Sequence, residues 1–170
     1  MKRVIVGMLF VAPLLVVAQV PESNKAPVSN ASVEELVDSL KPRPRTRSMG
    51  RNLAVEPARI DLSINFEFNS ATLRADSIPL LERLAAAMST EQLIRSTFQV
   101  EGHTDSVGNP RYNDALSMKR AQAVVDLLIQ NKVEPSRLQS IGKGSSEPLL
   151  PDEPTAAANR RVRISAIETR

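Results

Sequence analysis

Asp105 and Arg120 are the charged residues whose types and spacing predict a binding site. Asp105 comes directly after a strand expected over residues 98–104, and Arg120 lies about two turns into a helix expected over residues 113–131. Because helical side chains lean toward the N-terminus of their helix, Arg120 should point back toward the loop that carries Asp105. A carboxylate and a guanidinium bordering one cleft suit a zwitterion, with Asp105 binding an ammonium group and Arg120 a carboxylate. The spacing fits a structural role equally well, in which Asp105 caps the helix or pairs with Arg120.

The loop between these two residues contains the turn signal Gly108-Asn109-Pro110. Asn113 or Asp114 is expected to cap the helix that follows, because short polar side chains accept hydrogen bonds from free backbone N–H groups. Asn113 and Arg120 are seven positions apart, which brings them to nearly the same helix face, with Ser117 between them. The stretch therefore reads as a strand, a loop and a helix with polar side chains facing one region.

The elements that must position these residues alternate between strand and helix. Residues 60–68 alternate apolar and polar side chains, which predicts a strand. A helix that begins at Asp76 or Ser77 would place apolar residues on one side, and further strands are expected over residues 139–143 and 161–166. Since the strands alternate rather than being apolar throughout, helices should cover only one face of the sheet. We expect a two-layer α/β sandwich, of the α+β type, with the order β-α-β-α-β-β and helices packed on a mixed four-stranded sheet.

The N-terminal third of the chain differs from the rest. Residues 1–18 have a basic start followed by a short apolar run, which predicts a secretory signal peptide, with an uncleaved anchor as the alternative. Residues 19–57 are expected to be a disordered linker with one short helix, because Ser32 and Glu35 have the spacing of a capping box. The acid-free basic strip 41–51 is either a solvated linker or a segment attracted to anionic surfaces. The folded domain is expected to span residues 58–170.

Composition excludes several classes of function. The chain of 170 residues has no Cys and a single His, which excludes disulfides, thiolate metal sites and a His-rich metal centre. The sequence pI is about 9.6, but the basic excess lies before residue 58, and residues 58–170 carry equal numbers of acidic and basic side chains. With aromatic residues at only 3%, the domain lacks the basic face and stacking side chains of a nucleic-acid-binding protein. We expect no cofactor and no nucleic-acid partner.

An enzyme is the first competing hypothesis. His103 and Asp105 could form a hydrolase site with Ser106 or Ser117, but no G-x-S-x-G nucleophile motif is present. The stretch 142–145 superficially suggests a phosphate loop, yet it lacks the full spacing and a following helix. These patterns favour a binding protein without catalytic activity.

Several spaced motifs then carry a family resemblance. They are Phe66-Glu-Phe-Asn-Ser-Ala-Thr-Leu73, Gly102-His-Thr-Asp105, Tyr112-Asn113, Leu116-Ser117 with Arg120-Ala121, Gly142 with Gly144, and Asn159-Arg-Arg-Val162. Together, over about residues 58–168, they closely resemble the OmpA-like peptidoglycan-binding domain. The resemblance implies a non-catalytic module that binds the diaminopimelate of the peptide stem in the cell wall.

The resemblance also implies individual roles. Asp105 is similar to the family aspartate that receives the diaminopimelate ammonium, and Arg120 is similar to the arginine that binds its carboxylate. Four further positions match residues that line or shape the pocket, namely Asn113, Asn69, Thr104 and Leu116. The motif Asn159-Arg160-Arg161 opens the last strand, and a mainly structural role is expected for its arginines. Glu67 stands where many members have Asp.

The chain departs from the family in what precedes the domain. The sequence has no lipobox cysteine and no series of alternating strands that would form a barrel. We therefore expect an exported, periplasmic protein associated with the outer membrane and the cell wall. Its expected partner is peptidoglycan, and an envelope protein engaged through residues 19–57 is a second candidate partner. The second competing hypothesis is a protein–protein scaffold of an envelope or secretion complex, in which binding to the wall is secondary.

Overall fold

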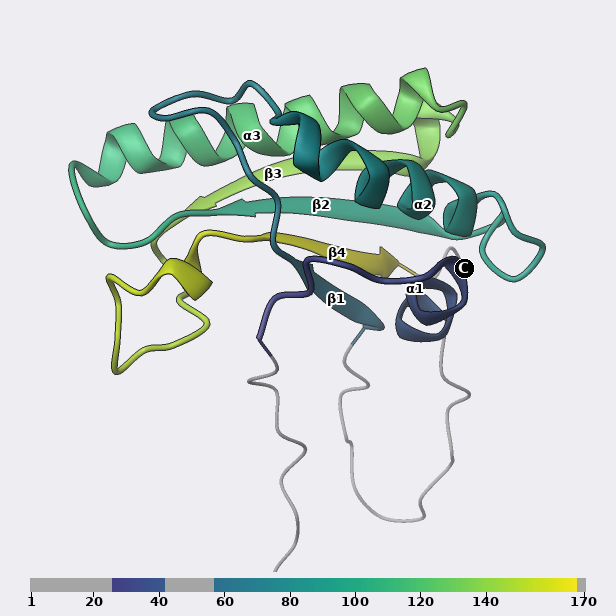
Figure 1. The fold of residues 1–170 in the computed structure, drawn as a ribbon, viewed down its shortest axis with the longest axis horizontal. Helices are drawn as coiled ribbons and strands as arrows, with labels where there is room; N and C mark the ends of the chain where they lie inside the picture. Colours follow the sequence, from purple (N-terminus) through teal and green to yellow (C-terminus); the bar gives the residue numbers. More distant parts are fainter. Residues whose placement is uncertain (1–25, 42–56, 168–170) are drawn as a thin grey trace, which may run out of the picture.

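A mixed sheet forms one layer of the molecule. The computed structural model describes residues 26–41 and 57–167, and within them the strands are β1 (Arg59–Leu62), β2 (Thr97–His103), β3 (Leu138–Gly144) and β4 (Val162–Ile167). The strand order is β1-β4-β2-β3. Strands β2 and β3 are parallel, whereas β4 runs antiparallel to both β1 and β2 (Figure 1). The predicted α+β sandwich on a mixed four-stranded sheet is confirmed.

The helices form the second layer. They are α1 (Val33–Leu40), α2 (Ile78–Met88) and α3 (Pro110–Gln130), and short 3₁₀ turns lie at Ala75–Ser77, Pro135–Arg137 and Ala157–Asn159. All three helices bury apolar side chains against the same face of the sheet. The apolar side expected for the helix after Ser77 is confirmed, with Leu80, Leu81, Leu84, Ala85 and Met88 all buried.

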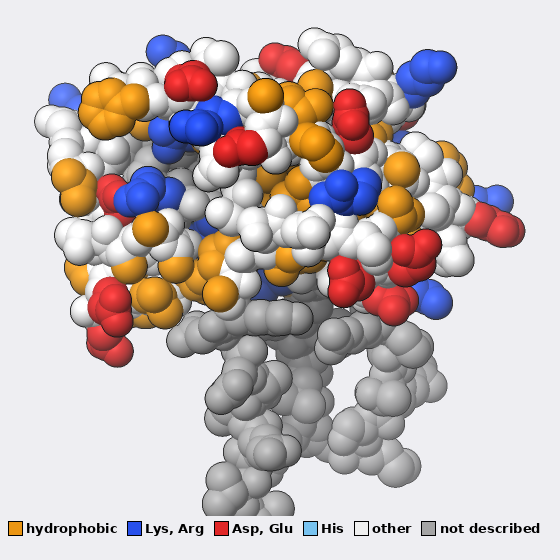
Figure 2. Space-filling model, in the orientation of Figure 1, with side chains coloured by type: hydrophobic (Ala, Val, Ile, Leu, Met, Phe, Trp, Pro, Cys, Tyr) orange, Lys and Arg blue, Asp and Glu red, His pale blue; other side chains and the backbone are white. Residues whose placement is uncertain are grey.

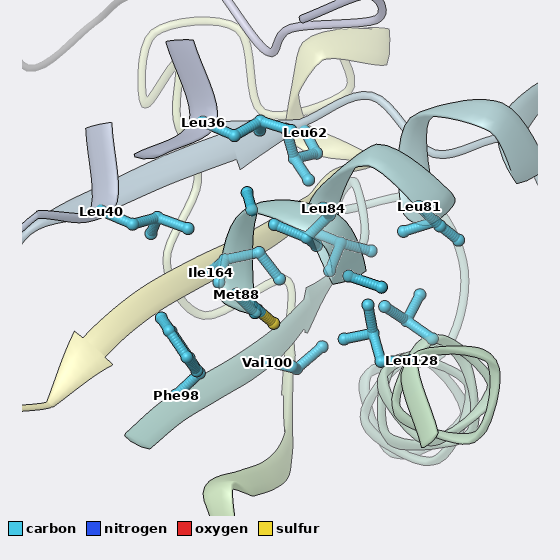
Figure 3. Close-up of a cluster of buried hydrophobic side chains, with 14 of the residues drawn as sticks. Leu36, Leu40, Leu62, Leu81, Leu84, Met88, Phe98, Val100, Leu128 and Ile164 are labelled. Atoms are coloured by element: carbon cyan, nitrogen blue, oxygen red, sulfur yellow. The ribbon is translucent and has the colours of Figure 1, made fainter. Parts of the chain in front are cut away.

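The hydrophobic core lies between these two layers. In β2, Phe98 and Val100 point toward the helices, while Glu101 and His103 point to the opposite face, because successive strand residues alternate. Figure 3 shows the core side chains of the strands meeting those of the helices. As one helix layer covers one sheet face, the other face is free to carry charged residues.

The first strand is shorter than predicted. The sequence alternates through residue 68, but β1 ends at Leu62, and the chain then leaves the sheet. The amide of Asn65 donates to the Ser77 hydroxyl at 2.8 Å, and Phe66 pairs with Leu73 in a local antiparallel bridge. The alternation of apolar and polar residues after Leu62 therefore belongs to a folded loop and not to the strand. This loop crosses over α3 before it reaches α2 (Figure 1).

Helix α3 begins earlier than predicted. Asn109 is its N-cap, and the Asn109 side chain accepts hydrogen bonds from the amides of Arg111 at 2.9 Å and Tyr112 at 3.3 Å. Pro110 occupies the first helical position, where its missing N–H costs nothing. The expectation that Asn113 or Asp114 caps the helix was wrong, because both lie inside the first turns.

Residues 26–41 belong to the folded unit. The predicted short helix and its capping box are confirmed in α1: the amide of Ser32 donates to the Glu35 carboxylate at 2.9 Å, and the amide of Glu35 donates to the Ser32 hydroxyl at 3.2 Å. This helix does not stand in a linker, because Leu36 and Leu40 are completely buried in the common core. The predicted signal peptide, residues 1–18, and residues 42–51 of the basic strip lie outside the described residues. Within the described part, no helix has the length and apolar character needed to span a membrane.

Candidate ligand-binding site

A polar cleft of about 480 Å³ opens between the loop that follows β1, helix α3 and the turn before β4. Figure 2 shows basic and acidic side chains interspersed on this face of the molecule. The residues that line the cleft come from four separate parts of the chain: Ser63, Ile64, Asn65, Phe66, Arg74, Asp76, Arg120, Ala157 and Arg160. Of the residues predicted for the site, Arg120 lies in this lining.

Arg120 is the half-buried cation of the cleft. Its Nε donates to the backbone oxygen of Ser70 at 3.0 Å, and its guanidinium stacks over the Phe66 ring at 4.9 Å from the ring centre. Burial lowers the pKa of Arg120, an effect opposed by Tyr112 and Asp105 and reinforced by Arg160. An arginine remains charged at neutral pH despite such a shift. No carboxylate among the described residues lies within ion-pair distance of Arg120, so its charge is available to a ligand.

Asp105 lies next to the cleft and contacts one of its lining residues, Arg160. One carboxylate oxygen, Oδ1, accepts a hydrogen bond from the amide of Val107 at 3.1 Å, which closes a tight turn after β2. The other, Oδ2, pairs with Nη1 of Arg160 at 2.7 Å. In the described structure Asp105 therefore neither caps α3 nor pairs with Arg120, and Arg160, for which a mainly structural role was expected, is its ion partner.

Asn113 supports the loop that carries Asp105. This residue is buried, and its Nδ2 donates to the backbone oxygens of Val107 at 3.0 Å and Asp105 at 3.4 Å. Thr104 is also buried, and its amide donates to the oxygen of Gly144 at 2.8 Å. Neither residue lies in the cleft lining, and the half-buried Leu116 does not either. Asn113 and Thr104 therefore support the backbone around Asp105, and Leu116 lies on α3 outside the cleft lining.

Asn69 lies at the tip of the loop that follows β1. It adopts a left-handed backbone conformation with φ of 52°, which asparagine tolerates better than most residues. Its side-chain oxygen accepts a hydrogen bond from the Tyr112 hydroxyl, which ties this loop to the first turn of α3. Asn69 thus fixes the position of the loop that supplies Phe66 and the Ser70 contact to Arg120.

Asn65, Arg74 and Asp76 are cleft residues that the sequence analysis missed. Asn65 was assigned to the overlong first strand, and Asp76 was considered only as a helix start. In the structure, Nδ2 of Asn65 donates to Oδ2 of Asp76 at 3.2 Å, and Nε of Arg74 lies 3.6 Å from the same oxygen. The polar composition of residues 65–76 was the available signal, but it gave no indication that these residues face Arg120.

A charged cluster occupies the opposite face of the sheet. Asp61 pairs with Arg161 at 2.7 Å and with Arg163 at 3.0 Å, and the imidazole of His103 lies 3.7 Å from the Glu101 carboxylate. Burial lowers the pKa of Arg161, although Asp61 opposes the shift. The side chain of Asn159 accepts from the amide of Leu150 at 2.9 Å and thereby orders the turn before β4. These contacts hold the β4 end of the sheet together.

The described geometry does not assemble the hydrolase site considered above. His103 points away from the helices, whereas Ser117 lies on α3, where its hydroxyl donates to the oxygen of Asp114 at 2.8 Å and accepts from the amide of Gly144 at 2.9 Å. The amide of Ser106 is bound to the oxygen of Pro154 at 3.0 Å. The described part of the chain also contains no group of three or more acidic, His or Cys side chains placed to hold a metal ion.

Comparison with known proteins agrees with this architecture. The outer membrane porin F of Pseudomonas aeruginosa is 36% identical over 140 residues, which cover 78% of this chain and 39% of the porin. Among solved structures, the cell wall anchor of the T6SS from Pseudomonas aeruginosa is 30% identical, with a TM-score of 0.54 over 68% of this chain and 85% of that one. The peptidoglycan-associated lipoprotein from Burkholderia pseudomallei shares the fold at 24% identity, with a TM-score of 0.51 over 61% of this chain and 86% of that one.

The chain matches only part of its curated relatives: 39% of the length of the porin F of Pseudomonas aeruginosa and 33% of that of the porin F of Pseudomonas fluorescens. Asp105 and Arg120 both lie within the residues that the family model matches. The model of the OmpA family matches residues 65–163, more than half of the chain, and the chain therefore belongs to the OmpA family.

Proposed function

We propose that this protein binds peptidoglycan in the cell envelope without catalysing a reaction, and that its cleft holds the diaminopimelate of the peptide stem. The protein would thereby tie the outer membrane or an envelope complex to the cell wall. Family membership supports wall binding in general, and the solved relative at 30% identity is named as a cell wall anchor. The proposal places this protein outside the cytoplasm, in the periplasm.

The observation that carries the proposal is the half-buried guanidinium of Arg120. It lines the cleft, stacks on Phe66 and has no carboxylate partner among residues 26–41 and 57–167. A cation that is partly removed from water is stabilised by an anion that binds beside it, because Coulomb attraction is stronger where water is excluded. A ligand carboxylate held bidentately by Arg120 would supply that anion.

Asp105 provides the second half of the recognition. Its Oδ2 pairs with Arg160, whose side chain is 49% exposed and can move, while Oδ1 stays bound to the Val107 amide. A ligand ammonium would replace Arg160 at Oδ2, and Arg160 would then be free to turn toward the ligand carboxylate. The free end of diaminopimelate carries an ammonium and a carboxylate on one carbon, which matches this pair of neighbouring charges.

The test is co-sedimentation of the exported chain, residues 19–170, with insoluble peptidoglycan, with and without free diaminopimelate. Asp105→Asn keeps the turn at Val107 but removes the charge, and Arg120→Gln removes the guanidinium. We expect each to weaken binding by about 10- to 100-fold, because removing one partner of a charge-assisted contact leaves the other uncompensated. Lys119→Gln is the matched control, since it removes one positive charge from an exposed neighbouring position on α3.

Binding that free diaminopimelate competes away, and that both site variants lose while the control keeps it, is the expected result. If the folded wild-type protein stays in the supernatant, the wall-binding proposal fails. The protein–protein scaffold hypothesis, with a partner bound through residues 19–57, would then be the one to pursue.

A further inference from the structure

The cleft extends beyond Arg120 to a second group of polar side chains. Asn65, Arg74 and Asp76 all come from the segment between β1 and α2 and line the same hollow as Arg120 and Arg160. Arg74 and Asp76 follow the motif that ends at Leu73, so the family resemblance assigns them no role. This second group lines a part of the cleft for which the proposed contacts of Arg120 and Asp105 give no role.

Asp76 is held by hydrogen bonds from two neighbouring side chains. Its Oδ2 accepts from Nδ2 of Asn65 at 3.2 Å, and its Oδ1 accepts from the Ser77 hydroxyl at 3.3 Å. The Ser77 oxygen is itself bound by the backbone amide of Asn65 at 2.8 Å. The half-exposed carboxylate is therefore held in place at this end of the cleft.

Arg74, in contrast, has donors to spare. Its Nε lies 3.6 Å from Asp76, a distance for an ion pair but too long for a hydrogen bond. Its guanidinium donates no hydrogen bond to any acceptor in the described part of the chain, and its side chain is 53% exposed. Asp76 keeps the side chain near the cleft, while an exposed pair of this kind is weak enough to yield to a better acceptor. An anion that entered this end of the cleft would meet these free donors.

We propose that Arg74 is a second anchor of the cleft and binds a further carboxylate of the same ligand. This inference rests on the proposed function, in which Arg120 and Asp105 hold the zwitterionic end of diaminopimelate. It specifies the ligand class further: an acidic peptide with at least one free carboxylate outside that zwitterionic end. A planar guanidinium with uncommitted N–H groups matches a carboxylate bidentately and gains less from a neutral amide.

Two soluble peptides test the inference by isothermal titration calorimetry with the exported chain. One is L-alanyl-γ-D-glutamyl-diaminopimelate with all its carboxylates free, and the other has every carboxylate outside the zwitterionic end converted to an amide. The wild-type protein should bind the free peptide about fivefold more tightly, the size of one partly exposed charge-assisted contact. Arg74→Gln should lose this preference and bind both peptides with the affinity of the wild type for the amidated one.

Lys119→Gln is again the matched control, and it should retain the preference although its net charge equals that of Arg74→Gln. Equal binding of the two peptides by the wild type, or an undiminished preference in Arg74→Gln, would overturn the Arg74 inference. If both peptides bind equally and Arg120→Gln abolishes that binding, only the second anchor is wrong. If neither peptide binds the wild type, the proposed function and this inference both fail.

Discussion

Three arginines of this protein have the same chemistry but different partners. Arg161 is buried and pairs with Asp61, Arg160 is half exposed and pairs with Asp105, and Arg120 has no carboxylate partner among the described residues. Arg160 and Arg161 are adjacent in sequence, yet their side chains reach different carboxylates on different parts of the domain. Whether an arginine can bind a ligand anion therefore depends on whether a carboxylate of the protein already pairs with it. Of these three arginines, Arg120 is the one without such a partner.

His103 is the residue whose burial most directly predicts a dependence on pH. Its side chain is buried near Glu101, Arg161 and Arg163, and neither ring nitrogen has a hydrogen-bond partner among the described residues. Burial lowers the pKa of His103 below its usual value of 6.5, opposed by Glu101 and reinforced by the two arginines. The pKa of Glu101 also lies below its usual 4.5, first because His103 faces it and then because Lys143 and Arg163 add positive charge, and these effects outweigh burial.

The unfolded chain therefore takes up a proton on histidine at a higher pH than the folded chain does. Stability associated with His103 is complete above its usual pKa of 6.5 and falls as the pH drops below it. We expect the thermal unfolding midpoint to decrease between about pH 7.5 and about pH 5.5, and to fall further below about pH 4.5 as Glu101 becomes protonated.

His103→Gln tests this account, because His103 is the single histidine of the chain. The variant should have a flatter profile between about pH 7.5 and about pH 5.5, and a smaller loss at lower pH, because His103 is the first cause of the lowered pKa of Glu101. The measurement is the unfolding midpoint by circular dichroism across this range. A variant profile parallel to the wild type would show that another group controls the first decline.

At the scale of elements, α3 lies unusually close to β2 and β3. A Cβ atom added to Gly102 would meet the backbone oxygen of Ser117 at 2.2 Å, and one added to Gly142 would meet the amide nitrogen of Met118 at 2.7 Å. The Ser117 hydroxyl also binds the Gly144 amide at 2.9 Å, so helix and sheet are joined directly. This close contact sets the height of Arg120 above the sheet and hence its position in the cleft.

Gly102→Ala should therefore destabilise the protein by about 1–3 kcal/mol, because α3 must shift to admit the added methyl group. We also expect weaker binding to peptidoglycan, since Arg120 moves with the helix. Urea unfolding gives the stability change, and co-sedimentation gives the binding change.

Gly108→Ala is the comparison for Gly102→Ala. Gly108 has φ of 95° and open space around it, so its substitution costs backbone strain alone, about 1 kcal/mol, and leaves α3 seated. Equal stability losses in the two variants would contradict the assignment of a close helix–sheet contact at Gly102.

At the scale of the whole molecule, the core extends to a segment that the sequence placed in a linker. Leu36 and Leu40 are completely buried with Leu62, Leu84 and Ile164, which belong to β1, α2 and β4 (Figure 3). Arg83 adds a polar connection, because its Nε donates to the backbone oxygen of Ala31 at 2.7 Å. Helix α1 is therefore part of the same folded unit as β1, α2 and β4.

Leu36→Ala should cost about 2–5 kcal/mol of stability, through lost burial and the cavity that remains. Asp38→Ala, an exposed substitution in the same helix, should change stability by no more than about 0.5 kcal/mol. Chemical denaturation of both variants measures the difference. If Leu36→Ala unfolds like the wild type, α1 contributes nothing to the folded unit, and a domain that begins near residue 58 would be sufficient.

Local sequence patterns were sufficient to predict most of the helices and strands and their order. Periodicity located α2, β2, β3 and β4 to within a few residues, and Ser32 and Glu35 identified α1, because side-chain spacing and capping act within one or two turns of the chain. The motifs also led to the family and to Arg120 as a candidate ligand-binding residue. The elements depend on residues that are close together in sequence, and the family resemblance depends on several short motifs in a fixed order.

Features that depend on contacts between distant residues became visible only in the folded protein. Alternation continued past Leu62, but β1 ends there because the amide of Asn65 is bound by Ser77 and not by a neighbouring strand. Asp105 could have paired with Arg120 or Arg160, and only the approach of the turn before β4 selects Arg160. The same approach, with the loop that crosses α3, brings Arg74 into the cleft of Arg120. These contacts form because packing of the whole core fixes where each loop lies. Local sequence patterns do not contain that information.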